Sequence, residues 1–237
     1  MTNPKYSRVL LKLSGEALSG DKGTGIDSEF INRICCEIKE VVIKQCQVAI
    51  VIGGGNIFRG MEASAQGQDR VTGDHMGMLA TVINSLALKQ TFQSININSV
   101  VMSAINMSPI AEVFSTEKAC QYLNANKVVI FSAGTGNPFF TTDTAAALRA
   151  AEIKADLLLK ATKVDGVYDK DPVKYSDAKM FKSLEFMQVI KDQLKVIDAT
   201  AASLCLENNI PLKVFNLLVK GNINKIIMGE DIGTTVK

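Results

Sequence analysis

The sequence predicts an α/β fold, an open three-layer α/β/α sandwich with a mainly parallel central sheet. Short, wholly apolar segments alternate along the 237 residues with longer segments of helical periodicity. Strands that are apolar on both faces must be covered on both faces, which a parallel sheet between two helix layers provides. The sequence has no Pro- or Ser-rich linker, composition break or internal repeat, so we expect residues 1–237 to form a single domain.

The expected strands are short and apolar at nearly every position, as in RVLLKL and QVAIVI. This pattern favours strands buried between helices over half-exposed ones. Core strands are expected at residues 8–13, 47–52, 98–103, 127–131, 155–161 and 212–215. The C-terminal segment GEDIGTTVK is expected to contain an edge strand.

Helical segments separate these strands. Apolar residues recur at helical spacing over 30–42, after Asp27, a residue type that caps helix N termini. Further helices are expected at residues 74–92, 116–123, 144–153, 183–194 and 198–208. If they serve no ligand, Asp74 caps the helix at 74–92, and Thr142 or Asp143 caps the helix at 144–153.

Composition argues against several classes of protein. A net charge of +2 does not suggest a nucleic-acid surface, and the longest apolar runs are too short to span a bilayer. The N-terminal residues lack a secretory signal. Five cysteines without a CxxC pair are expected to be reduced core residues of a cytoplasmic protein. A single histidine, His75, excludes a multi-histidine metal site, and we expect no metal site built by the protein alone.

The loop after the first strand, KLSGEAL, combines a lysine with a glycine turn. Lys12 would place a positive charge beside the backbone N–H groups around Gly15, which suits phosphate oxygens. A P-loop is excluded, because Asp21 and not lysine follows Gly20. The alternative is a strand-end lysine that merely reaches solvent.

The loop after the second strand is VIGGGNIFRG. Its three glycines permit positive φ and close approach of backbone to a ligand, and Arg59 can pair with a phosphate through two hydrogen bonds. Phe58 stands where a dinucleotide-binding GxGxxG motif needs its third glycine. The alternative is a simple tight turn.

The third loop, SAGTGNPFFTTD, leads directly into a helical segment. Tandem phenylalanines can pack a flat ligand while Asn137 bonds to its edge. Threonine hydroxyls at a helix start suit a phosphate group, because anions favour helix N termini. Asp143 would be repelled by phosphate, so we expect it to orient a lysine or a metal ion instead.

The fourth loop is KATKVDGVYDKDP, in which Tyr168 can frame a purine ring, although VDGVY is also compatible with an ordinary turn. Together the four loops supply cations, glycine amides, hydroxyls and aspartates, without a histidine base or a thiol nucleophile. This set of groups predicts phosphoryl transfer, in which catalysis is mostly positioning and charge neutralisation.

The four loops also carry a resemblance. LLKLSGEAL, VIGGGNIFRG, GDHMGMLAT, SAGTGNPFFTTDTAA and KATKVDGVYDKDP occur here in the order and spacing typical of the bacterial UMP kinases (uridylate kinases) of the amino-acid-kinase superfamily. The resemblance spans essentially the whole chain, and GTGNPFFTTD is its most specific part. It implies the fold of that superfamily and transfer of the γ-phosphoryl group of ATP to UMP, with Mg²⁺ bound through the ATP phosphates.

The resemblance also implies roles for individual residues. Catalytic roles fall on Lys12, Arg59, Asp143 and Asp198, with Asp143 or Asp198 holding Lys12 in place. ATP would contact Lys12, Leu13, Ser14, Gly15, Gly55, Arg59, Thr162, Tyr168 and Asp171. UMP would contact Gly54, Asp74, Thr135, Gly136, Asn137, Pro138, Phe139, Phe140, Thr141 and Thr142, with Asp74 on the ribose hydroxyls.

Regulation and assembly follow from the same resemblance. It implies a homohexamer activated by GTP and inhibited by UTP, in pyrimidine nucleotide biosynthesis. GTP control would involve Gly20, Asp21, Lys22, Gly23, Thr24 and Gly25. Two alternatives remain: a carboxylate kinase of the same superfamily acting on an amino acid, and a nucleotide sensor without turnover. The NPFF loop suits a nucleobase better than an amino acid, and binding alone does not require Lys12, Arg59 and Asp143 together.

Overall fold

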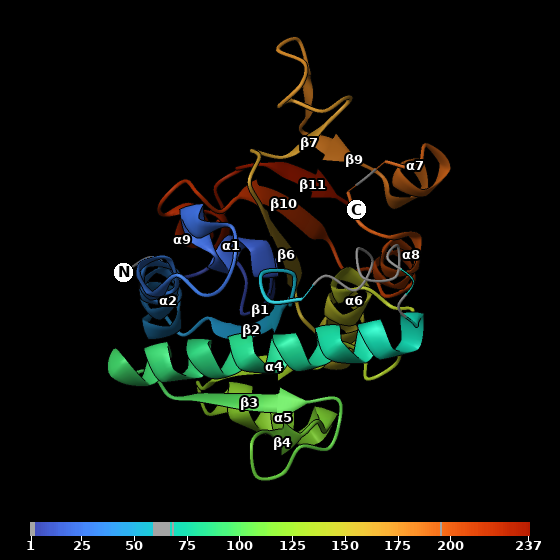
Figure 1. Cartoon of the computed structure of the whole chain (residues 1–237). Helices are drawn as coiled ribbons and strands as arrows, with labels where there is room; N and C mark the ends of the chain where they lie inside the picture. Colours follow the sequence, from blue (N-terminus) through green and yellow to red (C-terminus); the bar gives the residue numbers. More distant parts are fainter. Residues whose placement is uncertain (1–2, 59–66, 68, 195) are drawn as a thin grey trace.

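A nine-stranded, mainly parallel sheet forms the centre of the computed structural model, which describes residues 3–58, 67, 69–194 and 196–237 (Figure 1). Its described strands run in the order β4-β3-β5-β2-β1-β6-β10-β11-β9. They are β1 Arg8–Leu13, β2 Gln47–Ile52, β3 Ser99–Ser103, β4 Glu112–Val113, β5 Val128–Ser132, β6 Leu157–Thr162, β9 Ser183–Leu184, β10 Leu212–Asn216 and β11 Thr234–Val236. The described neighbours pair in parallel, except β10 with β11.

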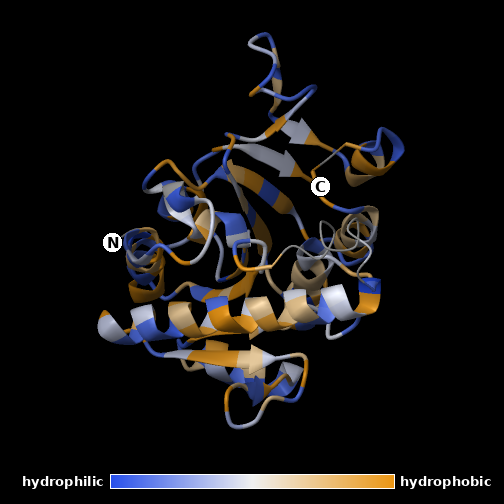
Figure 2. Cartoon of the chain, viewed as in Figure 1, coloured by the Kyte–Doolittle hydropathy of each residue, from blue (hydrophilic) through white to orange (hydrophobic). Residues whose placement is uncertain are grey.

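Helices cover both faces of this sheet. They are α1 Gly15–Leu18, α2 Ser28–Ile43, α4 Arg70–Ser94, α5 Thr116–Asn124, α6 Thr142–Glu152, α7 Phe186–Lys191, α8 Ala199–Glu207 and α9 Asn222–Ile227, with a 3-10 turn at Gly20–Lys22. In β1, Val9 and Leu11 pack in a cluster with α2, α4 and α9, whereas Leu10 packs in a cluster with α5, α6, α7 and α8. Alternate residues of one strand therefore pack against opposite helix layers. Apolar colouring covers much of the central strands and also parts of the helices, α4 among them (Figure 2). The predicted α/β/α sandwich is confirmed.

Beyond the sheet, a short antiparallel hairpin of β7 Val167–Tyr168 and β8 Met180–Phe181 projects from one end of the molecule (Figure 1). None of the helices in the described residues is long and apolar enough to cross a membrane. Cys35, Cys46 and Cys205 are buried and free, as expected for core residues, whereas Cys36 is exposed. Burial raises the pKa of Cys46 and of Cys205 to about 12.

Two predicted helix starts are wrong. Helix α4 begins at Arg70, because Asp69 caps it by accepting a hydrogen bond of 2.8 Å from Thr72 N. Asp74 therefore lies inside the helix and is not its N-cap. Helix α6 is capped neither by Thr142 nor by Asp143: Thr141 Oγ1 accepts from Asp143 N at 3.0 Å.

The C-terminal third contains further departures, and the short elements α1 and β4 were not predicted either. The helix predicted at 183–194 is instead β9 followed by the short helix α7, because Leu184 enters the sheet beside Val236. Helix α9 was not predicted. The predicted C-terminal edge strand is β11, but it is not at the edge, since β9 lies outside it.

Candidate active site

The four loops singled out in the sequence meet at one rim of the sheet. They follow β1, β2, β5 and β6, which are four consecutive strands in the order β5-β2-β1-β6. Because these strands are parallel, their carboxyl ends lie at the same edge. Segments separated by more than a hundred residues thus build one site.

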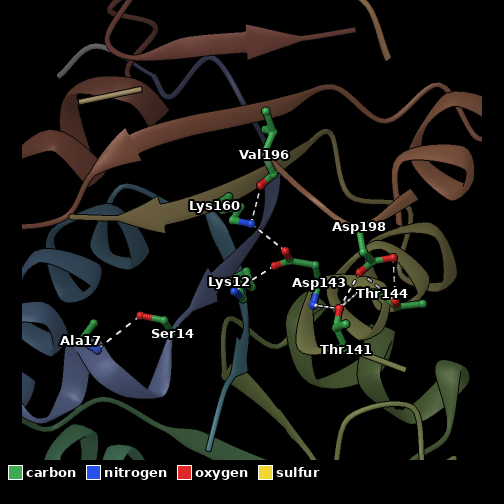
Figure 3. Close-up of polar contacts among 9 residues, drawn as sticks. All are labelled: Lys12, Ser14, Ala17, Thr141, Asp143, Thr144, Lys160, Val196 and Asp198. Carbon is green, nitrogen blue, oxygen red and sulfur yellow. Dashed lines mark hydrogen bonds and ion pairs between the residues drawn. The ribbon is translucent and has the colours of Figure 1, made fainter. Parts of the chain in front are cut away.

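Two lysines and one aspartate form the centre of this rim (Figure 3). Lys12 Nζ lies 2.8 Å from Asp143 Oδ1, and Lys160 Nζ lies 2.6 Å from Asp143 Oδ2. Lys160 also donates a hydrogen bond to the Val196 carbonyl. Asp143 occupies the first turn of α6, where the helix dipole favours a negative charge. We call these three residues the lysine–aspartate cluster.

The cluster is largely buried, with side-chain exposures of 12% for Lys12, 15% for Asp143 and 16% for Lys160. Burial opposes ionisation of Asp143, but the charges of Lys12 and Lys160 outweigh it and lower the pKa of this carboxyl. Burial lowers the pKa of Lys160, and the adjacent Asp143 offsets part of that effect. Asp143 is therefore held as a carboxylate at neutral pH.

Asp198 lies beside the cluster but makes other contacts. It caps α8 by accepting from Ala201 N at 2.9 Å. It also accepts from Thr141 Oγ1 at 2.5 Å and from Thr144 Oγ1 at 2.9 Å (Figure 3). The ion pair found for Lys12 in the described residues is with Asp143. Of the two aspartates expected to hold Lys12, the geometry thus favours Asp143, and Asp198 joins the N termini of α6 and α8.

One cavity, of about 390 Å³, opens between α4 and the loop from β5 to α6. We call it the Asp74 cavity. Eight residues expected from the sequence line it: Gly54, Gly55, Asp74, Thr135, Asn137, Phe140, Thr141 and Thr142. Gly136, Pro138 and Phe139 are not among its lining residues. Phe139 is instead 66% exposed. The Arg70 guanidinium lies over its ring, with Arg70 Cζ 5.7 Å from the centre of the Phe139 ring.

Asp74 connects the two walls of this cavity. Both of its oxygens accept from Arg70 Nε, at 2.9 and 3.0 Å, and Oδ2 also accepts from Phe139 N at 2.7 Å. Phe139 has a φ of +70°, which is unusual for a residue with a side chain and must be held by its surroundings. Asp74 thus fixes the Phe139 backbone while its carboxylate still borders the cavity.

A second cavity, of about 550 Å³, lies at the end of β6 beside the β7–β8 hairpin. We call it the Tyr168 cavity. All three residues expected on the nucleoside of ATP line it: Thr162, Tyr168 and Asp171. Lys160 lines it too, and therefore connects this cavity to the lysine–aspartate cluster.

A model of the amino acid kinase family matches residues 7–216. The chain belongs to the amino acid kinase family. Among solved structures, a UMP kinase from Bacillus anthracis is 40% identical with a TM-score of 0.94, over 98% of this chain and 96% of that one. A UMP kinase from Ureaplasma parvum is 39% identical with a TM-score of 0.91, over 98% and 99%. The uridylate kinase from Archaeoglobus fulgidus is 30% identical with a TM-score of 0.74, over 97% and 99%.

In this amino acid kinase, the glycines after β1 and β2 pack on each other. A Cβ on Gly15 would lie 2.5 Å from Gly55 N, and one on Gly54 would lie 2.8 Å from Gly77 O of α4. The three glycines of the GGG turn do not adopt positive φ, contrary to one of the two reasons given from the sequence. Gly53 and Gly54 leave no room for a Cβ, whereas a Cβ on Gly55 would make only an ordinary contact of 3.8 Å with Glu16 Cγ. We call the contact between Gly15 and the GGG turn the glycine seam.

The remaining expected residues lie at or near the same rim. Leu13 is fully buried, so its side chain belongs to the core, and Ser14 caps α1 by accepting from Ala17 N at 3.3 Å. Arg59 lies outside the described residues, and so does any contact it makes.

The segment expected to respond to GTP forms a turn next to the GGG loop. Gly20, Gly23 and Gly25 have positive φ, which a glycine adopts without strain. Gly25 N donates to Asn56 O at 3.0 Å, and Asn56 Nδ2 donates to Gly25 O at 2.7 Å. This segment is therefore bonded to the residue that follows Gly55.

Two residues of the site were missed from the sequence. Lys160 was assigned only to a strand, although LLK occurs in both RVLLKL and DLLLKAT, and that repeat was the available signal. Arg70 was missed because the helix was expected to begin at Asp74. The structure shows that Arg70 belongs to the same helix, four residues before Asp74, so the two side chains lie on one face.

Proposed function

We propose that this amino acid kinase is a UMP kinase, which transfers the γ-phosphoryl group of ATP to UMP and releases UDP and ADP. One observation carries the proposal: a buried cluster of two lysines and one aspartate lies between two cavities, in a chain whose solved relatives at 39% and 40% identity are UMP kinases. Two polyanions can meet only where positive charge offsets their repulsion.

The Asp74 cavity is the proposed UMP site. Asp74 would accept hydrogen bonds from the ribose hydroxyls, because each carboxylate oxygen can accept more than one donor. Asn137 would bond to the base edge, and Thr141 and Thr142 at the start of α6 would face the phosphate, where the helix dipole favours an anion. The Arg70 contact would keep the carboxylate oriented before UMP arrives.

The Tyr168 cavity is the proposed site for the nucleoside of ATP, with Tyr168, Thr162 and Asp171 around it. The ATP phosphates would then extend along the rim towards Lys12 and the amides of Gly15 and Gly55. Arg59 is proposed near the transferred group, on the basis of the sequence alone.

The proposed reaction needs no general base. The phosphate of a monoester has a second pKa of about 6, so UMP is largely dianionic at neutral pH and can attack directly. Lys12 would neutralise charge on the transferred group, and Asp143 would hold its ammonium in place. Both functions depend on position, which the burial of the cluster provides.

Mg²⁺ is proposed to enter with ATP. It would supply positive charge that offsets the negative charge of the nucleotide phosphates. In the described part of the chain, no three His, Cys, Asp or Glu side chains are grouped as a metal site. Asp143 and Asp198 already hold lysines and threonines, so the donors present suit a metal carried by the nucleotide.

Assembly, regulation and location are proposed as well. A homohexamer is proposed from the family resemblance. The exposed side chains of Met76, Leu79, Ile83 and Leu86 follow one face of α4, and this apolar stripe supports contact with another copy of the chain. Activation by GTP through residues 20–25 is supported by the bonds between Gly25 and Asn56; inhibition by UTP would follow from occupation of the Asp74 cavity. Free cysteines support a cytoplasmic location, and the continuous sheet supports a single domain.

A coupled assay tests the proposed function. Purified protein is given ATP and Mg²⁺ with UMP, CMP, acetylglutamate or aspartate, and ADP release and the phosphorylated product are measured. We expect turnover with UMP, giving UDP. Phosphorylation of acetylglutamate or aspartate alone would instead identify a carboxylate kinase, and nucleotide binding without any turnover would identify a sensor.

A further inference from the structure

Helix α4 holds both ends of the loop between β5 and α6. At the end of the loop that follows β5, Thr81 Oγ1 accepts a hydrogen bond from Ala133 N at 2.7 Å. Towards the other end, Asp74 Oδ2 accepts from Phe139 N at 2.7 Å. Asp74 and Thr81 are seven residues apart, about two helical turns, so their side chains lie on the same face of α4. One helix therefore sets the position of both ends of this loop.

The two residues that α4 anchors have an unusual backbone conformation. Ala133 has a φ of +60° and Phe139 a φ of +70°. In the described part of the chain, every other residue with a side chain and a positive φ lies two residues beyond the end of a helix, where this conformation is common. Away from a helix end it persists only when the surroundings hold it. Thr81 provides that support for Ala133, as Asp74 does for Phe139.

The Thr81 hydroxyl has a single proton, which fixes the direction of its two contacts. Oγ1 donates this proton to the Met78 carbonyl at 2.7 Å, so towards Ala133 N it acts as an acceptor. Thr81 lines the Asp74 cavity but is only 5% exposed, and Ala133 is fully buried. Loss of the hydroxyl would therefore leave the Ala133 N–H without this acceptor in the protein interior, which is destabilising.

Ala133 begins the turn that carries the proposed contacts with the base. Gly136 N donates to the Ala133 carbonyl at 2.9 Å and closes this turn. Asn137 N then donates to Thr135 Oγ1 at 3.2 Å. Both Thr135 and Asn137 line the Asp74 cavity. The position of the Ala133 backbone therefore determines where these two side chains lie in the cavity.

We infer that Thr81 is a positioning residue for nucleotide selection, which holds the start of the β5–α6 loop so that Thr135 and Asn137 meet the base edge of a pyrimidine nucleoside monophosphate. This inference deepens the proposed function and rests on it. Thr81 acts through the loop and not on the reacting atoms. The competing explanation is a purely structural hydroxyl, whose loss would lower stability without changing which nucleotide is preferred.

The test replaces Thr81 with valine, which keeps the branched shape and removes the hydroxyl, and measures the binding of UMP, CMP and ATP by calorimetry. The matched control is Thr91→Val on the same helix. The Thr91 hydroxyl also bonds within α4, to the Ala87 carbonyl at 3.0 Å, but Thr91 does not line the Asp74 cavity. Thr81→Ser, which keeps the hydroxyl, is the conservative variant. Thermal unfolding reports how much stability each variant has lost.

We expect Thr81→Val to weaken UMP binding by about 5- to 50-fold and to lower the preference for UMP over CMP by about three- to tenfold, because a buried N–H loses its acceptor and the loop moves. ATP binding should stay within about twofold. Thr81→Ser should keep UMP affinity and preference within about threefold of the wild type, and Thr91→Val should leave both unchanged. If Thr81→Val does not fold, Thr81→Cys, whose thiol is a weaker acceptor, is expected to shift both in the same direction.

Two results would overturn the inference. A ratio of UMP to CMP affinity equal to that of the wild type in Thr81→Val, with reduced thermal stability, would make the hydroxyl purely structural. The same loss of preference in Thr91→Val would show that any disturbance of α4 is sufficient, and that the bond to Ala133 is not responsible. Failure of the proposed function is distinguishable, because binding is measured without turnover: a protein that selects UMP through Thr81 but never makes UDP would refute only the UMP kinase proposal.

Discussion

The two cavities beside the lysine–aspartate cluster are built differently. The Asp74 cavity joins distant elements, because the Phe139 N–H of the β5–α6 loop donates to Asp74 of α4, a separation of 65 residues. The Tyr168 cavity is bordered by a projecting hairpin that makes its own hydrogen bonds, such as Lys179 N to Asp169 Oδ1 at 2.8 Å (Figure 1). The base of this hairpin is tied to the sheet, because Val167 N donates to Thr234 Oγ1 of β11 at 2.8 Å and Thr234 Oγ1 donates to the Phe181 carbonyl. The outer part of the hairpin, beyond Tyr168, is held by local bonds.

This difference indicates which cavity is expected to select more strictly between nucleotides. Where long-range contacts fix a cavity wall, loss of those contacts moves the wall and lowers the affinity for the ligand. The outer part of the hairpin, which is held by local bonds, can shift at little cost to the core, whereas its base is bonded to Thr234 of β11. We therefore expect strict selection for the nucleotide in the Asp74 cavity and a more gradual response in the Tyr168 cavity.

The largest expected effect on activity comes from Lys12, which lies in the lysine–aspartate cluster. Its loss should impair the reaction itself and not the binding of one nucleotide more than the other. Lys12→Ala should lower kcat by about 100- to 1000-fold, because a preorganised donor to the transition state is lost. The KM values for ATP and UMP should both change modestly in steady-state assays. A kcat near that of the wild type would remove Lys12 from the chemistry.

Asp74→Ala should weaken ligand binding in the Asp74 cavity and leave the Tyr168 cavity unaffected. We expect the KM for UMP to rise about 10- to 100-fold, since a charged acceptor and the tie to Phe139 are both lost. The KM for ATP should stay within about twofold. Asp69→Ala is the matched control: it removes the cap of the same helix, at a cost of about 1 kcal/mol in stability, without touching the cavity. An unchanged KM for UMP would refute the assignment.

Tyr168→Ala should act on the other cavity, and more weakly. Loss of an aromatic contact with the base should raise the KM for ATP about three- to tenfold, with the KM for UMP unchanged. Tyr175→Ala is the matched control, because Tyr175 belongs to the same hairpin but is 52% exposed and does not line the cavity. Equal effects of the two substitutions would show that the hairpin as a whole, and not the ring of Tyr168, matters.

The smallest expected effect is on the free energy of unfolding at acid pH. It tests whether Asp143 in the lysine–aspartate cluster is charged. Because Lys12 and Lys160 lower the pKa of Asp143 despite its burial, its ionisation stabilises the fold above the ordinary carboxyl pKa of 3.8. That stability is lost as pH falls through the lowered value. The free energy of unfolding of Asp143→Asn should therefore be below that of the wild type at pH 7, and the gap should narrow below pH 3.8. A gap independent of pH would contradict the charge assignment.

Much of this arrangement could be predicted from the sequence, because it follows from strand order. Apolar runs predict buried parallel strands, and the rim of a parallel sheet then collects the strand ends and helix starts that carry Lys12, Asp74 and Asp143. The family resemblance predicted that Asp143 or Asp198 holds Lys12, and the contact with Asp143 is present. The roles of the predicted binding residues stay predictions.

The features that could not be predicted depend on the register between paired strands and on which of two nearby residues caps a helix. Lys160 meets Asp143 only because β1 and β6 pair with Lys12 opposite Lys160, and sequence does not reveal that offset. Asp69 and Asp74 are both suitable N-caps, and only the fold shows that Asp69 is used. The segment 183–194 has helical periodicity, but pairing of Leu184 with Val236 decides its first residues.

The glycine seam limits how this protein can evolve. At Gly15 even a methyl group would lie 2.5 Å from the backbone of Gly55, so a mutation there must push apart the ends of β1 and β2. Such a displacement would carry Lys12 away from Asp143. A compound that bound across these two turns would face a target with almost no freedom to acquire resistance by substitution at Gly15.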